Sequence, residues 1–201
     1  MSLRANWLTL SRVLLALVFA WRFRVDDERA LLTSLALLVL MGVSDILDGY
    51  LARRKNGGSR AGELIDSVAD GFARFTALLV FLDARLLPVW MVLVIFWRDL
   101  ISWGLRFMDL GQGRDDVHKR VSGKVNGAVQ SAAIGITVVL AYLAVAGDRA
   151  VPLGVVWWLM LASAGTSVWS TLDLLYTYRR TLRRFTWRDR AEDGRAKSGS
   201  A

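Results

Sequence analysis

The sequence predicts an all-α membrane protein with six transmembrane helices. Of its 201 residues, 54% are hydrophobic and the mean hydropathy is +0.37, which is rich in apolar residues for a soluble domain. The charged residues gather in short segments between apolar runs, as charged residues do beside membrane spans. One compact membrane domain fits this length and pattern.

The six predicted spans cover residues 7–21, 30–44, 68–82, 86–107, 127–146 and 151–175. Several are shorter than the roughly 20 residues that a span needs, and their flanks extend them. A short cytoplasmic interfacial segment precedes the first span, and Arg12 within that span argues against a cleaved signal peptide. We predict a membrane domain over residues 1–178, followed by a basic, partly disordered cytoplasmic tail over residues 179–201.

The distribution of Lys and Arg predicts the orientation of the spans. With a cytoplasmic N-terminus, eighteen of them lie in inner segments and five in outer segments, while Arg12, Arg74 and Arg98 remain inside spans. We therefore expect an integral membrane protein with both termini in the cytoplasm. The net charge of +8 belongs to these juxtamembrane segments, so nucleic acid is not an expected partner. The absence of cysteine excludes disulfides, thiol nucleophiles and cysteine-ligated zinc.

Four aspartates adjoin the second and third apolar runs at regular spacing. Asp45 and Asp48 stand at i and i+3, and Asp66 and Asp70 stand at i and i+4, so each pair shares one helix face. A turn at residues 55–60 between antiparallel helices lets the two pairs converge. Carboxylates crowded in a low dielectric repel one another, and hard divalent cations are their natural partners. The sequence predicts a magnesium or manganese site at the cytoplasmic face.

Small residues and an arginine accompany these acids. Gly49 and Gly62 remove side chains where a bulky ligand approaches the backbone, and Arg53 lies one turn beyond Gly49, within reach of a phosphate oxygen. Together with the acids they predict a pocket for a metal-bound diphosphate. The alternative, that the acids merely flank helix ends, leaves Asp70 inside an apolar run unexplained.

The spacing D-x2-D-G-x2-A-R-x8-G-x3-D-x3-D, which runs from Asp45 to Asp70, resembles without gaps the signature of the CDP-alcohol phosphotransferase family. The stretch from Asn6 to Arg12 is similar to the N-x-L-T-x-x-R element that precedes the first span in that family. The resemblance implies a six-helix membrane enzyme, commonly a homodimer. Such an enzyme displaces CMP from a CDP-linked lipid, here CDP-diacylglycerol, with a polar alcohol acceptor.

The resemblance also implies roles for individual residues. A pair of divalent metals, Mg²⁺ or Mn²⁺, would be bound by four aspartates, of which Asp70 would also accept the proton of the acceptor hydroxyl. The four metal ligands are Asp45, Asp48, Asp66 and Asp70, and the residues that line the CDP pocket are Gly49, Ala52, Arg53 and Gly62.

The acceptor is predicted from three basic residues. Arg98, Arg106 and Lys124 stand in R-D-L, G-L-R and G-K-V elements that resemble those of phosphatidylglycerophosphate synthases, which implies that they bind the phosphate of glycerol 3-phosphate. Asp99, Ser67 and Gly71 depart from that subfamily, which usually has Glu, Pro and Lys there. Arg106 and Lys124 also fit an alternative role as positive-inside anchors.

Other acceptors and another class of function stay open. Residues 124–130, K-V-N-G-A-V-Q, also resemble the K-V-N-x-A-x-Q stretch of cardiolipin synthases of the same family, whose acceptor is phosphatidylglycerol. Inositol phosphate is a third possible acceptor. Intramembrane acids can instead line the cation pathway of a transporter or channel. That alternative predicts acids spread across the bilayer depth, whereas these gather at one face.

Overall fold

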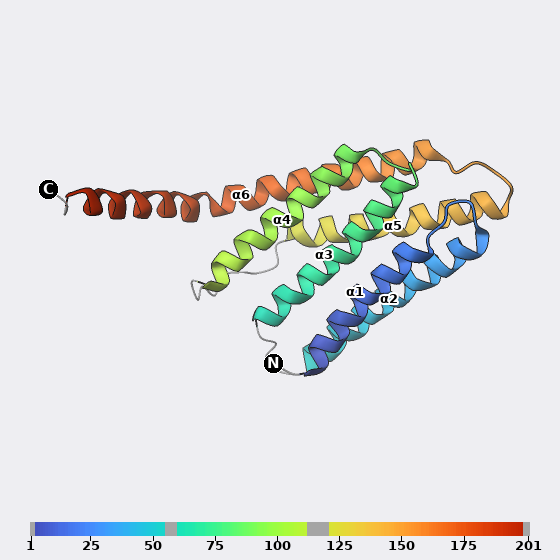
Figure 1. The fold of residues 1–201 in the computed structure, drawn as a ribbon, viewed down its shortest axis with the longest axis horizontal. Coiled ribbons are helices and arrows are strands. Elements are labelled where there is room, and N and C mark those ends of the chain that lie inside the picture. The colour runs from blue at the N-terminus through green and yellow to red at the C-terminus, as the bar shows by residue number, and fades with distance from the viewer. Residues whose placement is uncertain (1–2, 55–59, 112–120, 199–201) are drawn as a thin grey trace.

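The computed structural model describes the backbone of residues 3–54, 60–111 and 121–198, and the side chains of residues 11–44, 62, 64–108 and 121–179. Within these residues all regular structure is helical (Figure 1). The helices are α1 (Leu3–Arg22), α2 (Glu28–Arg54), α3 (Arg60–Asp83), α4 (Val89–Gly111), α5 (Val121–Ala146) and α6 (Leu153–Ser198). The all-α prediction is confirmed, and each helix contains most of one predicted apolar run.

Two helices extend well beyond their apolar runs into the acidic array. α2 continues to Arg54, past the predicted end of its run at residue 44, and α3 begins at Arg60, before the predicted start at residue 68. Leu, Ala and Arg are frequent in these extensions and all have high helix propensity. The acids therefore belong to helices, as predicted, while the predicted turn falls mainly on residues outside the described part of the chain.

Capping explains where several helices begin. Asp27 Oδ1 accepts hydrogen bonds from the backbone amides of Arg29 at 2.9 Å and Ala30 at 3.2 Å, the geometry of an N-cap, so α2 begins immediately after Asp27. Pro88 and Pro152 directly precede α4 and α6. The first amides of a helix have no partner within the helix, so proline, which lacks an amide hydrogen, is well tolerated at a helix start. Both helices begin slightly later than the apolar runs around them.

The turns that follow α3 and α5 have the same backbone geometry. Arg85 and Asp148 have φ values of 57° and 51°, in the left-handed region. In each case the next backbone amide donates to a carbonyl five residues earlier, at 2.9 Å after Arg85 and 2.7 Å after Asp148. These bonds satisfy carbonyls that the helix end would otherwise leave unpaired.

Successive helices run antiparallel and form one bundle (Figure 1). α1 packs against α2 and α3, α6 packs against α4 and α5, and α3 contacts α4 and α5 between these groups. We call the end at which α1 begins and α2 ends the site end. The end that carries the connections at residues 23–27, 84–88 and 147–152 is called the far end. Antiparallel packing places the first turns of α3 and the last turns of α4 together at the site end.

Buried side chains divide the bundle along its length. Toward the far end they form an apolar core, which includes Phe19, Phe23, Leu31, Leu78, Phe81, Met91, Val138, Val156 and Met160. Toward the site end they are mostly polar, and include Arg12, Arg98, Asp99, Ser102, Ser122, Asn126, Gln130, Ser167 and Ser170. Buried polar groups need partners, so stability at the far end comes from packing and at the site end from hydrogen bonds and ion pairs.

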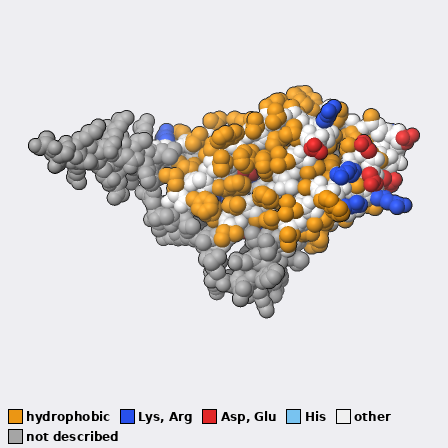
Figure 2. Space-filling view, viewed as in Figure 1, with side chains coloured by type: hydrophobic (Ala, Val, Ile, Leu, Met, Phe, Trp, Pro, Cys, Tyr) orange, Lys and Arg blue, Asp and Glu red, His pale blue; other side chains and the backbone are white. Residues whose placement is uncertain are grey.

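The outer surface is largely apolar. Figure 2 shows hydrophobic side chains over the middle of the visible face and charged side chains gathered at the far end. Large exposed side chains include Leu17, Trp97, Leu143, Trp158 and Leu172. On length and composition, α5 and residues 153–179 of α6 are able to cross a membrane. The other helices contain more charged residues, among them the aspartates of the array.

α6 crosses the predicted boundary of the tail. It continues as one helix from Leu153 to Ser198, so the backbone changes neither direction nor type at residue 179. In Figure 1 its C-terminal part extends beyond the rest of the bundle. The division into a membrane domain and a tail stays a prediction.

Candidate active site

Two of the four predicted metal ligands lie one turn apart on α3. Asp66 and Asp70 share a face near the site end, and their side chains are 43% and 24% exposed. Gly62 lies one turn before Asp66 on the same face. The predicted stripe of a glycine and two carboxylates is therefore formed by the backbone of α3.

Arg12 of α1 lies against both carboxylates. Its side chain is only 4% exposed, and its Nη1 donates to Asp66 Oδ1 at 3.0 Å and to Asp70 Oδ1. An arginine inside an apolar helix is expensive unless an anion or hydrogen-bond acceptor compensates it. The two aspartates supply that compensation and attach α1 to α3 at the site end.

Asp66 and Asp70 offer the type of ligand atom that suits a divalent cation. Carboxylate oxygens are the ligands that Mg²⁺ and Mn²⁺ prefer, and here two carboxylates are held together by a shared donor. Among the described side chains, no three acidic or histidine groups lie close enough together to hold a metal ion. A complete site therefore needs ligands from elsewhere, and Asp45 and Asp48 are the predicted ones.

The α2 half of the predicted site is defined by its backbone alone. Asp45, Asp48, Gly49, Ala52 and Arg53 all lie in the last turns of α2, so the spacing i, i+3, i+4 and i+7 is helical as predicted. Their side chains lie outside the described residues. The convergence of the two acid pairs and the CDP pocket stay predictions.

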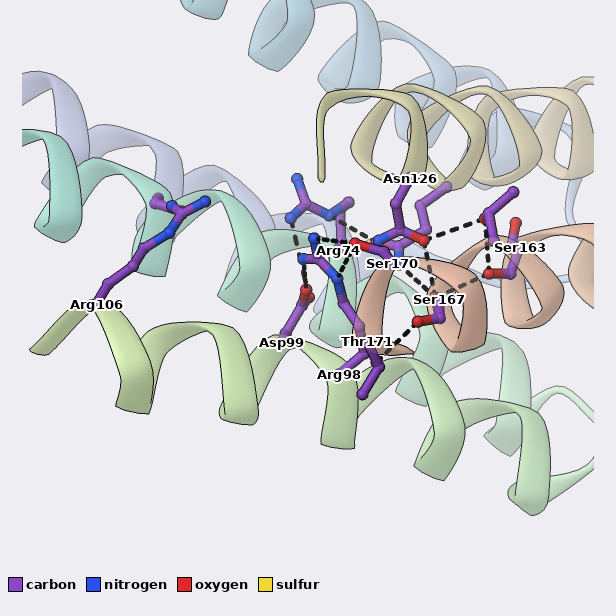
Figure 3. A network of polar contacts seen from close by, with 12 residues as sticks. Arg74, Arg98, Asp99, Arg106, Asn126, Ser163, Ser167, Ser170 and Thr171 are labelled. Carbon is purple, nitrogen blue, oxygen red and sulfur yellow. Dashed lines mark hydrogen bonds and ion pairs between the residues drawn. The ribbon is translucent and has the colours of Figure 1, made fainter. Parts of the chain in front are cut away.

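Beyond Asp70, a chain of buried polar side chains crosses the bundle from α3 to α6, drawn in Figure 3. We call it the polar network, and it consists of Arg74, Arg98, Asp99, Asn126, Gln130, Thr166, Ser167 and Ser170. Arg74 lies one turn beyond Asp70 on α3, and its Nε donates to Gln130 Oε1 at 3.0 Å. Gln130 Nε2 in turn donates to Ser167 Oγ at 3.1 Å. The network therefore joins α3, α5 and α6 next to the acid pair.

Asp99 is the anion of this network. Its Oδ1 accepts a hydrogen bond from Arg98 Nη1 at 2.7 Å, and its Oδ2 lies 3.9 Å from Arg74 Nη2. Arg98 also donates to Ser170 Oγ, from Nη2 at 2.9 Å and from Nε at 3.3 Å. A charge-assisted contact of this kind is stronger than a neutral hydrogen bond, so the network fixes the orientation of both arginines.

The three predicted acceptor ligands lie in different environments. Arg98 is buried and bound within the network, whereas Arg106 lies two turns nearer the site end, apart from the network in Figure 3. Arg106 Nη1 donates at 3.0 Å to Ser67 Oγ, on the residue that follows Asp66. Lys124 is exposed near the start of α5. Of the three, Arg106 is the one with a described contact to the first turns of α3.

Gly123, the residue before Lys124, lies close to the side chain of Arg98. A Cβ atom at Gly123 would lie 3.2 Å from Arg98 Nη2, so this close approach of α5 to α4 favours a small residue. One residue earlier, Ser122 Oγ donates to Asp173 Oδ2 at 2.6 Å and attaches α5 to α6. The G-K-V element thus has a packing role around Arg98.

Sequence reasoning assigned no site role to Arg12 or Arg74. Both are arginines inside apolar runs, and a charged residue in such a run often has a functional role. Their partners were beyond prediction, because Arg12 reaches α3 from α1 and Arg74 reaches α5 from α3. The serines of α6 gave no signal, since isolated serines are common in membrane helices.

Comparison with known proteins identifies the family. The model of the family described as CDP-alcohol phosphatidyltransferase matches residues 2–177. The chain is 32% identical over 141 residues to the CDP-diacylglycerol–glycerol-3-phosphate 3-phosphatidyltransferase of Bacillus subtilis (strain 168), covering 64% of this chain and 72% of that relative. It is 28% identical over 176 residues to CDP-diacylglycerol–glycerol-3-phosphate 3-phosphatidyltransferase 2 of Arabidopsis thaliana, covering 81% and 74%.

A third relative is named for another activity. The chain is 42% identical over 66 residues to the cardiolipin synthase (CMP-forming) of Streptomyces coelicolor, covering 33% of this chain and 31% of that relative. Three observations indicate the same family: the family match, the similarity to the Bacillus subtilis enzyme, and the D-x2-D-G-x2-A-R-x8-G-x3-D-x3-D spacing on α2 and α3. The chain belongs to the CDP-alcohol phosphatidyltransferase family of membrane enzymes.

Proposed function

We propose that this enzyme transfers the phosphatidyl group of CDP-diacylglycerol to glycerol 3-phosphate, with release of CMP. Its CDP-alcohol phosphatidyltransferase activity follows from the family, whereas the acceptor is the proposed part. Two relatives named for glycerol 3-phosphate are each covered over more than 70% of their length, and a third over 38%. The relatives named for cardiolipin synthesis are covered over 31% to 46% of their length. Membership of this enzyme family replaces the alternative of a cation transporter or channel.

The contact between Arg106 and Ser67 supports a phosphorylated acceptor. Arg106 donates to Ser67, the residue that follows Asp66, so a guanidinium contacts α3 at the level of the acid pair. A guanidinium recognises a phosphate through parallel hydrogen bonds, which favours an acceptor that carries a phosphate near its reacting hydroxyl. Arg98 and Lys124 are proposed as further contributors to this positive field.

The reaction proposed at this site is a displacement at phosphorus. The acceptor hydroxyl forms a bond to the phosphorus that carries diacylglycerol, and the bond from that phosphorus to the bridging oxygen of CMP breaks. The hydroxyl proton passes to the carboxylate of Asp70, and CMP leaves with both bridge electrons. Asp70 is suited to this role because α3 holds it one turn from Asp66, where the diphosphate would be bound.

The proposed cofactor is a pair of divalent cations, Mg²⁺ or Mn²⁺. Members of this family use a divalent metal. Asp66 and Asp70 would hold it together with Asp45 and Asp48, and Gly49, Ala52, Arg53 and Gly62 would line the CDP pocket. Bound cations would neutralise the negative charge that builds on departing CMP.

The second candidate function is cardiolipin synthesis, with phosphatidylglycerol as acceptor. Its support is the K-V-N-x-A-x-Q resemblance at residues 124–130 and the shorter match to a cardiolipin synthase. Two polar residues of that stretch have structural partners here: Asn126 Oδ1 lies 2.9 Å from Ser167 Oγ, and Gln130 contacts Arg74 and Ser167. Because contacts within the bundle account for Gln130 and for the oxygen of Asn126, the stretch by itself carries little information about the acceptor.

We further propose that all six helices span the membrane, with both termini and the site end in the cytoplasm. The support is the excess of Lys and Arg in the segments assigned to the inner side. The chain has no cysteine, so single substitutions such as Arg149→Cys at the far end and Lys197→Cys in the tail can be labelled from either side of intact cells. We expect only the first to react with an impermeant reagent. A homodimer is also proposed, on the family resemblance.

A direct assay tests the acceptor. The purified protein is incubated with CDP-diacylglycerol and Mg²⁺ or Mn²⁺, and separately with glycerol 3-phosphate, phosphatidylglycerol or inositol phosphate, and CMP and the lipid product mass are measured. We expect metal-dependent CMP release with glycerol 3-phosphate. Faster release with phosphatidylglycerol would select the second candidate, and no release with any acceptor would remove the proposed function.

A further inference from the structure

Arg12 is a buried cation whose described partners are the two acids of α3. It lies within the apolar run of α1, and its side chain is 4% exposed. Burial of an unpaired guanidinium is strongly unfavourable. The position is therefore maintained by what Arg12 contacts, and its Nη1 contacts Asp66 and Asp70.

The geometry of that contact bears on how the carboxylates are oriented. Asp66 and Asp70 carry like charges at i and i+4, which repel one another on a helix surface. The same Nη1 donates to Oδ1 of both residues, so it draws these two oxygens together against their repulsion. The described contact engages one oxygen of each carboxylate.

We propose that Arg12 is a positioning residue for the divalent cation: it orients the carboxylates of Asp66 and Asp70 for metal binding and does not itself touch the metal or the substrate. This inference rests on the metal site of the proposed function. Carboxylates that ligate metals are commonly held by a further hydrogen bond, and loss of that bond typically weakens metal binding by about 10–100-fold. Arg12 supplies such a bond to two ligands at once, from a different helix.

A purely structural role for Arg12 makes a different prediction. If Arg12 only attaches α1 to α3, its replacement lowers the stability of the bundle and leaves the intrinsic affinity of the folded protein for metal unchanged. If the guanidinium instead competes with the metal for the carboxylates, its replacement strengthens metal binding. Metal affinity in the absence of substrate therefore separates the three roles, whereas turnover alone does not.

The experiment measures Mn²⁺ binding by electron paramagnetic resonance on the full chain in detergent, with no lipid substrate or acceptor present. The variants are Arg12→Gln, Arg12→Lys and the control Arg24→Gln, which removes the same charge at an exposed position beyond the C-terminal end of α1. Arg24 lies at the far end and donates to the carbonyl of Phe23. Circular dichroism checks that each variant is folded.

We expect Arg12→Gln to bind Mn²⁺ at least about 10-fold more weakly than the unmodified chain, and Arg24→Gln within about 2-fold of it. Arg12→Lys keeps the charge but not the planar fork, so we expect an intermediate loss, and this variant decides the question if Arg12→Gln does not fold. Unchanged or tighter binding in a folded Arg12 variant overturns the proposal. Failure of the unmodified chain to bind Mn²⁺, or undiminished binding by Asp66→Asn, would instead remove the metal site of the proposed function.

Discussion

The indole ring of Trp103 on α4 lies directly against the backbone of Gly71 on α3, so that a Cβ atom at position 71 would collide with Cζ2 of the ring. Gly71 immediately follows Asp70, the proposed base. The phosphatidylglycerophosphate synthases that the sequence resembles have a lysine there, and in this protein a tryptophan fills the adjacent space. The contact between α3 and α4 at the level of the proposed site therefore depends on a glycine.

We predict that Gly71→Ala destabilises the protein by about 1–3 kcal/mol, the usual cost of overpacking a close contact. Thermal unfolding in detergent would measure the loss. Gly104→Ala is the matched control, because a Cβ atom there has no neighbour within 4 Å, and it should not lower the unfolding temperature. A second change, Trp103→Leu, should restore part of the stability of Gly71→Ala. An unaltered unfolding temperature for Gly71→Ala alone would contradict the contact.

Asp70→Asn should lower the rate of CMP release at least about 100-fold, since a general base typically contributes 10²–10⁴-fold and this residue is also a proposed metal ligand. Asp66→Asn should likewise abolish turnover while the protein remains folded. The control is Asp83→Asn, at the other end of the same helix, for which we expect nearly full activity. Activity retained by either site variant would refute its proposed role.

Arg106→Gln should raise the apparent KM for glycerol 3-phosphate on the order of tenfold, equivalent to about 1.4 kcal/mol of lost binding, and should change the KM for CDP-diacylglycerol little. Steady-state kinetics with each substrate varied in turn would test this. Arg85→Gln, at the far end, provides the control for loss of one positive charge. If an unphosphorylated alcohol such as glycerol shows the same rise in KM, Arg106 does not contact the acceptor phosphate.

Ser170→Ala should destabilise the bundle by about 1–3 kcal/mol, because Arg98 would lose the hydroxyl that accepts from its Nε and Nη2. The loss would be read as a lower unfolding temperature in detergent. Ser131→Ala, at an exposed position of α5, should have no measurable effect. Equal stability of the two variants would show that the hydroxyl of Ser170 contributes nothing to the network.

Arg98 illustrates how the structure changes the interpretation of a residue. The sequence predicts a ligand for the acceptor phosphate, and the structure adds a bidentate contact to Ser170 and an ion pair with Asp99. Arg98→Ala is therefore expected to lower stability as well as acceptor affinity, since it leaves Asp99 without its 2.7 Å partner. Kinetics of Arg98→Ala need a parallel measurement of unfolding before they report on the acceptor.

The sequence by itself determined the helical class, the approximate positions of the six helices and the spacing of the acids along α2 and α3. Apolar runs decide which segments are helical and buried, because burial of apolar surface dominates the free energy of folding. Helical periodicity, a local property, then places Asp66 one turn from Asp70 without any knowledge of the neighbouring helices.

Only the tertiary structure decided which helices supply the partners of those acids. Arg12 reaches Asp66 from a helix more than fifty residues earlier in the chain, and Arg74 meets Gln130 across a similar separation. Hydrogen bonds and ion pairs of this kind depend on which helices pack together and on their rotation about their own axes. Those properties arise from the side-chain packing of the whole bundle, which no local pattern in one sequence specifies.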